Sequence, residues 1–136
     1  MRRLMMCVAT FAIAGAMAPG ASAATSDAIP CGSSFFHAGT YVQYCPDWSP
    51  NNWIPVYAGH SIGSGQVGSI YAPGYDWYVC QHRYPNDVYA LGAYQNDVWA
   101  KTMADNGRWG WVSEVYFRGG RNYEVDAGLD FCFDPA

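Results

Sequence analysis

The pentapeptide at residues 59–63 is the part of the chain that comes closest to a catalytic motif. It reads GHSIG and matches the G-x-S-x-G nucleophile elbow, in which a strand-to-helix turn lifts a serine above a parallel sheet. The residues that follow, Ser64, Gly65 and Gln66, show no helical pattern, and a chain of this length cannot hold an α/β-hydrolase sheet. The sequence therefore predicts a glycine-rich loop here and a protein that is not an enzyme.

The histidines and the acidic C-terminal residues are the other candidates for chemistry, as metal ligands. His37, His60 and His82 are 23 and 22 residues apart, without the close pairs that a catalytic zinc site uses. Four acidic residues between positions 124 and 134 lack the D-x-D-x-D-G spacing of a calcium loop. We expect surface histidines and a solvated acidic tail, with no metal and no cofactor.

The N-terminus carries the features of a signal peptide, residues 1–23. Two arginines are followed by an uncharged stretch that ends in Ala-Ser-Ala, the small-x-small pattern that a signal peptidase reads. A Pro-Gly pair at residues 19–20 interrupts the stretch, whereas a membrane-spanning helix needs about 20 predominantly apolar residues. We expect cleavage between Ala23 and Ala24, a secreted (extracellular) protein and no membrane insertion after cleavage; an uncleaved anchor is the alternative.

The five cysteines predict disulfides. Cys7 lies in the predicted signal peptide, and the remaining four are Cys31, Cys45, Cys80 and Cys132, at spacings of 14, 35 and 52 residues. An even number in a short exported chain predicts two disulfides, whereas zinc sites use close C-x-x-C pairs. Three pairings are open from the sequence alone, and we favour Cys45–Cys80 in the core with Cys31–Cys132 joining the ends.

The charge of the mature chain limits its partners. Without the first 23 residues, 113 remain, a length that fits one domain, and they carry five basic and eleven acidic side chains, a net charge of −6. Such a chain lacks the electrostatic attraction that phosphate backbones and anionic lipids exert on basic proteins. We expect no nucleic acid partner, a cell-wall component or an extracellular protein as the ligand, and a monomer.

Aromatic residues are abundant, with six Trp, eleven Tyr and six Phe in 136 residues. A small core holds only part of them, and exposed Tyr and Trp supply rigid, amphipathic contact area for sugars or peptides. The alternative is that the terminal segments cover these rings. The candidate ligand-binding residues, taken from strand ends and loops, are Tyr57, Tyr71, Trp77, Tyr94, Trp99, Trp111 and Tyr116.

The secondary structure that must position these rings is predicted to be all-β. Short runs rich in Val, Ile, Tyr and Trp lie between Gly and Pro residues, which is typical of strands. An Asn-Gly pair at residues 106–107 is a strong hairpin signal, and several short strands with tight turns favour a small barrel or sandwich. The predicted strands are residues 53–57, 68–71, 76–82, 88–91, 98–102 and 109–113.

Two segments flank this strand-rich stretch, which covers residues 53–118. An N-terminal extension at residues 24–52 leads into a polar loop at residues 46–53, and an acidic C-terminal extension covers residues 119–136. Because both extensions carry cysteines, we expect disulfides to pin them onto the strand-rich stretch.

Three pieces of the chain, in order, resemble the bacterial SH3-like (Src-homology-3-type) domains of secreted proteins. They read VYAGHSIGSGQVGSI at residues 56–70, VWAKT at residues 98–102, and GWV at residues 110–112 followed by Tyr116 and Phe117. The run MADNGRWGWV at residues 103–112 is similar to small secreted proteins of actinobacteria. The resemblance covers residues 53–118 and implies a small SH3-like β-barrel without catalytic activity.

The motif with which eukaryotic SH3 domains bind proline-rich peptides is absent, so that ligand is not implied. The leading hypothesis is a secreted, non-catalytic binding module that recognises cell-wall peptide or glycan, or a protein partner, through its aromatic residues. The second hypothesis is a secreted inhibitor or toxin-like effector held by disulfides, in which the loop at residues 46–53 enters a partner's site.

Overall fold

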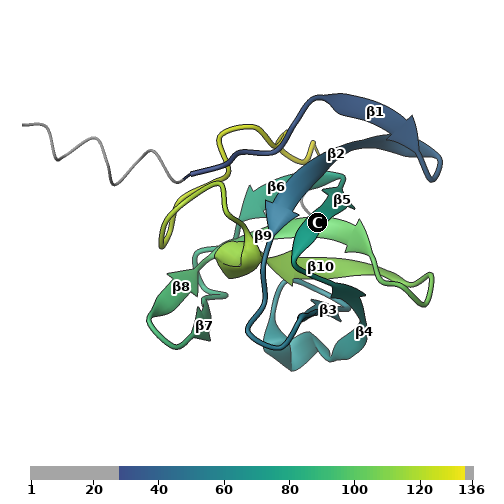
Figure 1. The fold of residues 1–136 in the computed structure, drawn as a ribbon. Coiled ribbons are helices and arrows are strands. Elements are labelled where there is room, and N and C mark those ends of the chain that lie inside the picture. The colour runs from purple at the N-terminus through teal and green to yellow at the C-terminus, as the bar shows by residue number, and fades with distance from the viewer. Residues whose placement is uncertain (1–27, 134–136) are drawn as a thin grey trace, which may run out of the picture.

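The computed structural model describes residues 28–133, and these form three antiparallel β-sheets (Figure 1). The all-β prediction is confirmed, because the helical elements of this part of the chain are two short 3-10 turns, η1 (Ile62–Ser64) and η2 (Glu114–Tyr116). Within residues 28–133, no helix has the length and apolar character needed to cross a membrane. The predicted signal peptide and its cleavage site between Ala23 and Ala24 lie outside the described residues.

The largest sheet has five strands and contains most of the predicted ones. Its order is β4 (Gln66–Tyr71), β3 (Trp53–Tyr57), β10 (Trp109–Ser113), β9 (Val98–Met103) and β6 (Cys80–Arg83). β9 and β10 form the predicted hairpin around the Asn-Gly turn, where Gly107 has a φ of 86°. In the part of the chain that the structure describes, the end strands β4 and β6 are not paired with each other, so the sheet is open.

Strand β9 is covered on both of its faces. Val98, Trp99 and Ala100 are consecutive, so their side chains point to alternate faces, and all three are fully buried. A strand that is buried on both faces reads as a continuous apolar run, and this is the pattern of the sequence here. The other two sheets provide the covering layers.

The predicted N-terminal extension is a part of the second sheet. β1 (Ser34–His37) and β2 (Thr40–Asp47) form a hairpin, and β2 pairs along its length with β5 (Gly74–Tyr78), as seen at the top of Figure 1. The predicted strand at residues 76–82 is therefore two strands. It divides at Val79, where β5 ends in one sheet and β6 begins in the other, and the Val79 N–H donates to the Lys101 carbonyl at 2.8 Å.

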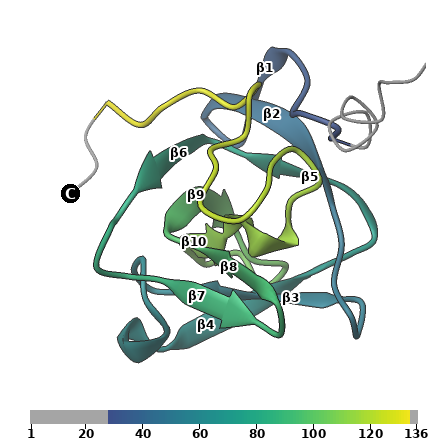
Figure 2. The ribbon, with the colours of Figure 1, turned by 90° about the vertical axis from the view of Figure 1, so that its left-hand side faces the viewer.

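The third sheet is the hairpin of β7 (Tyr89–Leu91) and β8 (Tyr94–Asn96). Figure 2 shows this hairpin across the lower part of the molecule, below the yellow C-terminal segment, and both of its strands contact η2. β7 confirms the predicted strand at residues 88–91 except for its first residue, whereas β8 was not predicted. This hairpin covers the aromatic residues of β9 and η2.

The disulfides pair Cys31 with Cys45 and Cys80 with Cys132, so the pairing that we favoured is wrong. The segment at Cys31 runs beside β2, where the Gly32 N–H donates to the Tyr44 carbonyl at 2.9 Å, and this brings the Cα atoms of Cys31 and Cys45 to 4.1 Å. This disulfide lies inside the N-terminal extension and does not attach it to the rest of the chain. Only Cys80–Cys132 pins an extension, the C-terminal one, as predicted.

Two buried glutamines hold the acidic C-terminal segment. The Gln43 side chain accepts from the Asp130 N–H at 2.8 Å and donates to the Gly128 carbonyl at 2.5 Å. The Gln81 side chain accepts from the Asp126 N–H at 2.9 Å and donates to the Leu129 carbonyl at 2.6 Å. The expectation of a solvated acidic tail is therefore wrong for residues 126–129, because these hydrogen bonds fold them against β2 and β6.

Candidate functional site

Three of the predicted binding residues meet, but in the core. Tyr57, Trp99 and Tyr116 surround Tyr89 of β7, whose ring centre lies 6.1, 5.7 and 5.6 Å from theirs. Their exposed fractions are 9%, 0% and 4%, respectively. The prediction that these three residues lie on an exposed binding face is wrong, because the β7–β8 hairpin inserts Tyr89 between them.

The remaining predicted residues do not share one face. Tyr71 and Tyr94 are about half exposed, at 54% each, whereas Trp77 and Trp111 are partly buried. Each packs edge-on against a different aromatic partner, which separates the candidates into several places. The pairs are Tyr71 with Trp53 at 5.3 Å, Trp77 with Trp109 at 5.7 Å, Trp111 with Tyr84 at 5.8 Å and Tyr94 with Trp48 at 5.3 Å.

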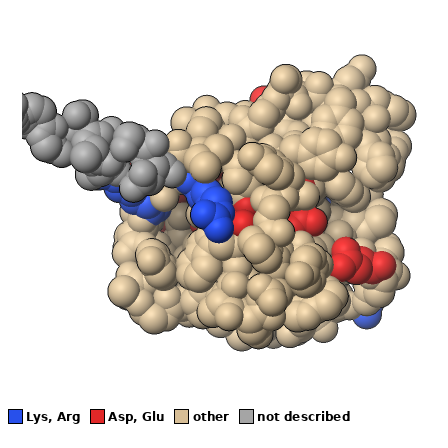
Figure 3. All heavy atoms as spheres, viewed as in Figure 1, with Lys and Arg blue, Asp and Glu red and all other residues tan. Residues whose placement is uncertain are grey.

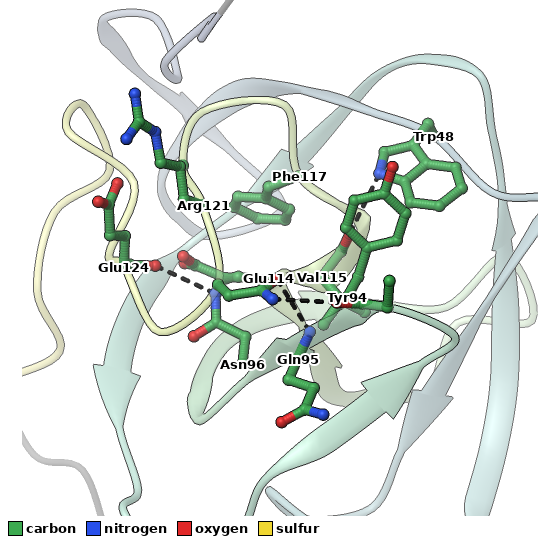
Figure 4. Close-up of a pocket in the computed structure, with 12 residues that line it drawn as sticks. Trp48, Tyr94, Gln95, Asn96, Glu114, Val115, Phe117, Arg121 and Glu124 are labelled. Carbon is green, nitrogen blue, oxygen red and sulfur yellow. Dashed lines mark hydrogen bonds between the residues drawn. The ribbon is translucent and has the colours of Figure 1, made fainter. Parts of the chain in front are cut away.

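The pair of Tyr94 and Trp48 lines a concave surface of the molecule. Two adjoining cavities, of ≈ 540 and ≈ 380 Å³, share Trp48, Tyr94 and Phe117 as lining residues. Figure 4 shows Trp48 and Tyr94 on one side of the larger cavity, Arg121 and Glu124 on the other, and Phe117 between them. We call these two cavities together the Trp48 groove.

Trp48 is held rigidly in the wall of this groove. It follows β2, and its backbone N–H donates to the Tyr116 carbonyl at 2.9 Å, while its indole Nε1–H donates to the Val115 carbonyl at 3.1 Å. Because one bond fixes its backbone and the other its indole ring, Trp48 has lost conformational freedom before any ligand arrives. Binding to such a ring costs little further entropy.

The opposite wall consists of residues 120–124, which are held against β8. The Asn122 side chain accepts from the Gln95 N–H and donates to the Ala93 carbonyl, each at 3.0 Å. The Tyr123 N–H donates to the Gln95 carbonyl at 3.2 Å, and the Asn96 side chain donates to the Glu124 carbonyl at 3.1 Å. These bonds join two segments that are far apart in the sequence into one stable wall.

Glu114, the first residue of η2, lines the larger cavity from below. Glu114 is 5% exposed. Its Oε2 accepts from the Asp126 N–H at 3.1 Å, and its Oε1 has no hydrogen-bond partner among the described residues. Burial raises the pKa of Glu114 well above its ordinary value, and the nearby Asp126 carboxylate raises the pKa further. Burial therefore disfavours a negative charge at the floor of the groove.

Two arginines extend the groove beyond its aromatic centre. Arg118 lines only the smaller cavity and Arg121 only the larger one, and both side chains are exposed. Within residues 28–133, the ion pairs are His60–Asp87 and Arg83–Asp97, so neither arginine is in a salt bridge, although the Arg118 charge acts on the buried Asp47 carboxyl. On the face of the molecule that Figure 3 shows, basic and acidic side chains lie close together in a band across the middle, and most of the remaining surface carries no charge.

The G-x-S-x-G motif and the histidines were the residues considered for catalysis or metal binding. The motif, residues 59–63, lies in the loop between β3 and β4 and runs into the 3-10 turn η1, and Ser61 has an extended backbone with a φ of −158°. His60 bonds to Asp87 through Nδ1 at 2.7 Å and stacks on Tyr84 at 3.5 Å between ring centres. Among the described residues, no group of three or more His, Cys, Asp or Glu side chains is arranged to hold a metal ion.

Most of the groove was missed at the sequence level. Of its main residues only Tyr94 was predicted to bind a ligand. Trp48 was assigned only to the loop of the inhibitor hypothesis, and Glu114, Phe117 and Arg121 were assigned to no site. The lining comes from four separate segments, around residues 48, 94, 115 and 122, and no local motif connects them. Only the abundance of aromatic residues indicated that such a surface exists.

Comparison with known proteins finds no match to this chain among family models, curated proteins or solved structures. What the structure itself defines is a disulfide-braced, all-β domain with an aromatic groove. Disulfides persist in oxidising compartments, which suggests an environment outside the cytosol.

Proposed function

We propose that this protein is a secreted, non-catalytic binding module that recognises a cell-wall polymer in the Trp48 groove. The signal-peptide pattern of residues 1–23 and the two disulfides support secretion. An SH3-like barrel formed by residues 53–118 is part of the proposal. The adjacency of β4, β3, β10 and β9, with η2 directly after β10, supports it.

The contact between Trp48 and Tyr94 carries the proposal. Binding sites for small ligands are typically clefts of about 300–1,000 Å³, mostly apolar with a few placed polar groups. The groove has this character, since a rigid indole and a half-exposed phenol meet edge-on at 5.3 Å, above the buried Glu114 carboxyl and beside two arginines. Aromatic side chains of this kind supply the contact area for sugar rings and apolar side chains.

A sedimentation assay with purified bacterial cell walls tests this function. We expect the mature protein to pellet with the walls at low salt, and Tyr94→Ala to weaken binding about 5- to 10-fold, the loss of roughly 1–1.4 kcal/mol expected when an interface aromatic is removed. Tyr75→Ala is the matched control, because Tyr75 is 67% exposed on β5 and does not line the groove. A wild-type protein that stays in the supernatant, or equal binding by the two variants, contradicts the proposal.

The second hypothesis, a disulfide-held inhibitor, has less support. Its loop at residues 46–53 begins with buried Pro46 and Asp47, and the largest side chain after them, Trp48, is bonded to Val115 and packed into the groove wall. The part of the loop that is free to enter a partner's site is the polar turn at residues 50–52. Assaying common secreted proteases with equimolar protein tests this alternative, and unchanged protease activity would count against it.

A further inference from the structure

The charges around the Trp48 groove narrow the class of ligand. Resting on the proposed function, we infer that the groove takes an extended acidic peptide of the cell-wall polymer, with carboxylates of the peptide bound by Arg118 and Arg121 on either side of the aromatic centre.

The arginines are available to a ligand. The chain is acidic, with eleven Asp and Glu against seven Lys and Arg, and only five of the basic residues fall within residues 28–133. Of these five, Arg83 is paired with Asp97, and Lys101 lies over the Trp109 ring at 5.8 Å. Arg118 and Arg121 are two of the remaining three, and both border the same groove. Their guanidinium groups suit carboxylates, which they bind with two parallel hydrogen bonds.

The floor of the groove disfavours a negative charge of its own. The charged groups that face Glu114 are Asp126 and Arg83, and burial together with Asp126 raises the pKa of the Glu114 carboxyl well above its ordinary value. Asp126 itself is 3% exposed, and its Oδ1 accepts from the backbone N–H groups of Cys31, Gly128 and Leu129. The acidic side chain left at the rim is Glu124, which is exposed beside Arg121.

The aromatic wall favours a peptide over an acidic sugar. A sugar ring stacks on an open, flat aromatic face, but the half-buried Trp48 ring is packed against Tyr94 at 5.3 Å and Tyr116 at 6.4 Å. An extended peptide places every second side chain on the same face, so an apolar residue with acidic residues two positions before and after it reaches the aromatic centre and both arginines at once. The cavities on both sides of the centre give room for such a chain.

Calorimetry with model peptides tests the inference. The probes are capped pentapeptides with the sequences Glu-Ser-Leu-Ser-Glu, Gln-Ser-Leu-Ser-Gln and Lys-Ser-Leu-Ser-Lys, with an oligomer of uronic acid as the carbohydrate arm. We expect the Glu peptide to bind best, and its affinity to fall as salt is added. Arg121→Gln should weaken it about 3- to 10-fold, as removal of a charged partner does. Glu124→Gln should tighten it about 2- to 5-fold, because a repulsive charge is lost.

Arg108→Gln is the matched control, since Arg108 is an exposed arginine on the β9–β10 turn and does not line the groove. For Arg118→Gln the melting temperature is measured beside the affinity. The Arg118 Nε–H also donates to the Asp47 carbonyl at 3.2 Å, so this substitution can lower the stability of the fold as well as the affinity. Equal affinities of Arg121→Gln and Arg108→Gln, or preference for the Lys peptide, overturn the inference. Tighter binding of the uronic acid oligomer overturns the peptide as occupant.

Cell walls whose carboxyl groups have been converted to amides separate this inference from the proposed function. We expect the protein to pellet with native walls and to be released from amidated ones. Equal pelleting with both leaves the proposed function standing and contradicts the acidic ligand. No pelleting with either contradicts the proposed function itself.

Discussion

The hydroxyl groups of Tyr89 and Tyr116 lie 2.6 Å apart and share a buried hydrogen bond between β7 and η2. Tyr89 is 6% exposed and Tyr116 is 4% exposed, so this bond lies in the core although both residues come from short, peripheral elements. It explains why Tyr57, Trp99 and Tyr116, three of the seven predicted binding residues, are covered. The exposed binding surface is displaced from them to the neighbouring Trp48 groove.

Two substitutions of Tyr89 should destabilise the fold to different extents. Tyr89→Phe removes the hydroxyl and leaves Tyr116 without this partner, for an expected loss of about 1–2 kcal/mol in the free energy of unfolding. Tyr89→Ala also opens a cavity among Tyr57, Trp99 and Tyr116, for a loss of about 3–5 kcal/mol. Urea denaturation measures both, with the exposed Tyr75→Ala as control. A loss for Tyr89→Ala no larger than that of the control would show that the hairpin does not pack as described.

Stability should decrease as the pH rises, because of a buried acid pair. The carboxyls of Asp47 and Asp76 act on each other's charge, and Asp47 Oδ2 accepts from the Tyr78 hydroxyl at 3.1 Å. Burial and the neighbouring Asp76 raise the pKa of Asp47 from 3.8 to about 9, and burial also raises the pKa of Asp76. Among the described residues, Oδ1 of Asp47 and Oδ2 of Asp76 are buried without a hydrogen-bond donor, so the pair favours a retained proton.

The unfolded chain loses this proton near pH 4, whereas the folded chain keeps it to about pH 9. The stabilising contribution is therefore complete below about pH 4 and is lost progressively as the pH rises towards 9, at up to about 1.4 kcal/mol for each pH unit. Urea denaturation between pH 4 and 9 should show this slope, and Asp47→Asn should flatten it. Asp130→Asn, an exposed acidic residue, is the control. An unchanged slope in Asp47→Asn would exclude the pair as its cause.

Gly110 is required where β10 approaches β3. A Cβ atom at this position would lie 2.3 Å from the Tyr57 carbonyl oxygen and 2.7 Å from a Val56 methyl group. Gly110→Ala should therefore lower the free energy of unfolding by about 2–3 kcal/mol or more, because backbone atoms must move apart. Gly32→Ala is the matched control, since its nearest contact would be at 3.8 Å. Thermal unfolding that does not distinguish the two variants would be incompatible with this packing.

The two disulfides should contribute unequally. Cys31–Cys45 spans 14 residues and Cys80–Cys132 spans 52, and a longer loop restricts the unfolded chain more. Replacing both cysteines of a pair by serine should cost about 3 kcal/mol for the short loop and about 4 kcal/mol for the long one. Chemical denaturation gives this order, and peptide mapping without reduction should recover the same two pairs. Recovery of Cys45–Cys80 instead would contradict the structure.

Local features of the sequence predicted local structure well. β3 and β10 have the predicted bounds, and the Asn-Gly turn joins β9 to β10. Such features depend on residues that are neighbours in the chain, namely alternating side chains and a glycine that accepts a positive φ. The long predicted strand at residues 76–82 was divided at Val79, because its two halves pair with β2 and β9 and follow different sheets.

The sequence by itself determined the all-β class, most strands of the large sheet, and the use of all four cysteines of the described chain in disulfides. Only the tertiary structure decided which cysteines pair, which aromatic residues are buried, and that Trp48, Tyr94 and Phe117 line one groove. The physical reason is that strand preference arises from adjacent residues, whereas pairing and burial depend on contacts between distant segments. Tyr89 on Tyr116 and the C-terminal segment on β8 are such contacts, and together they set where a ligand finds an open surface.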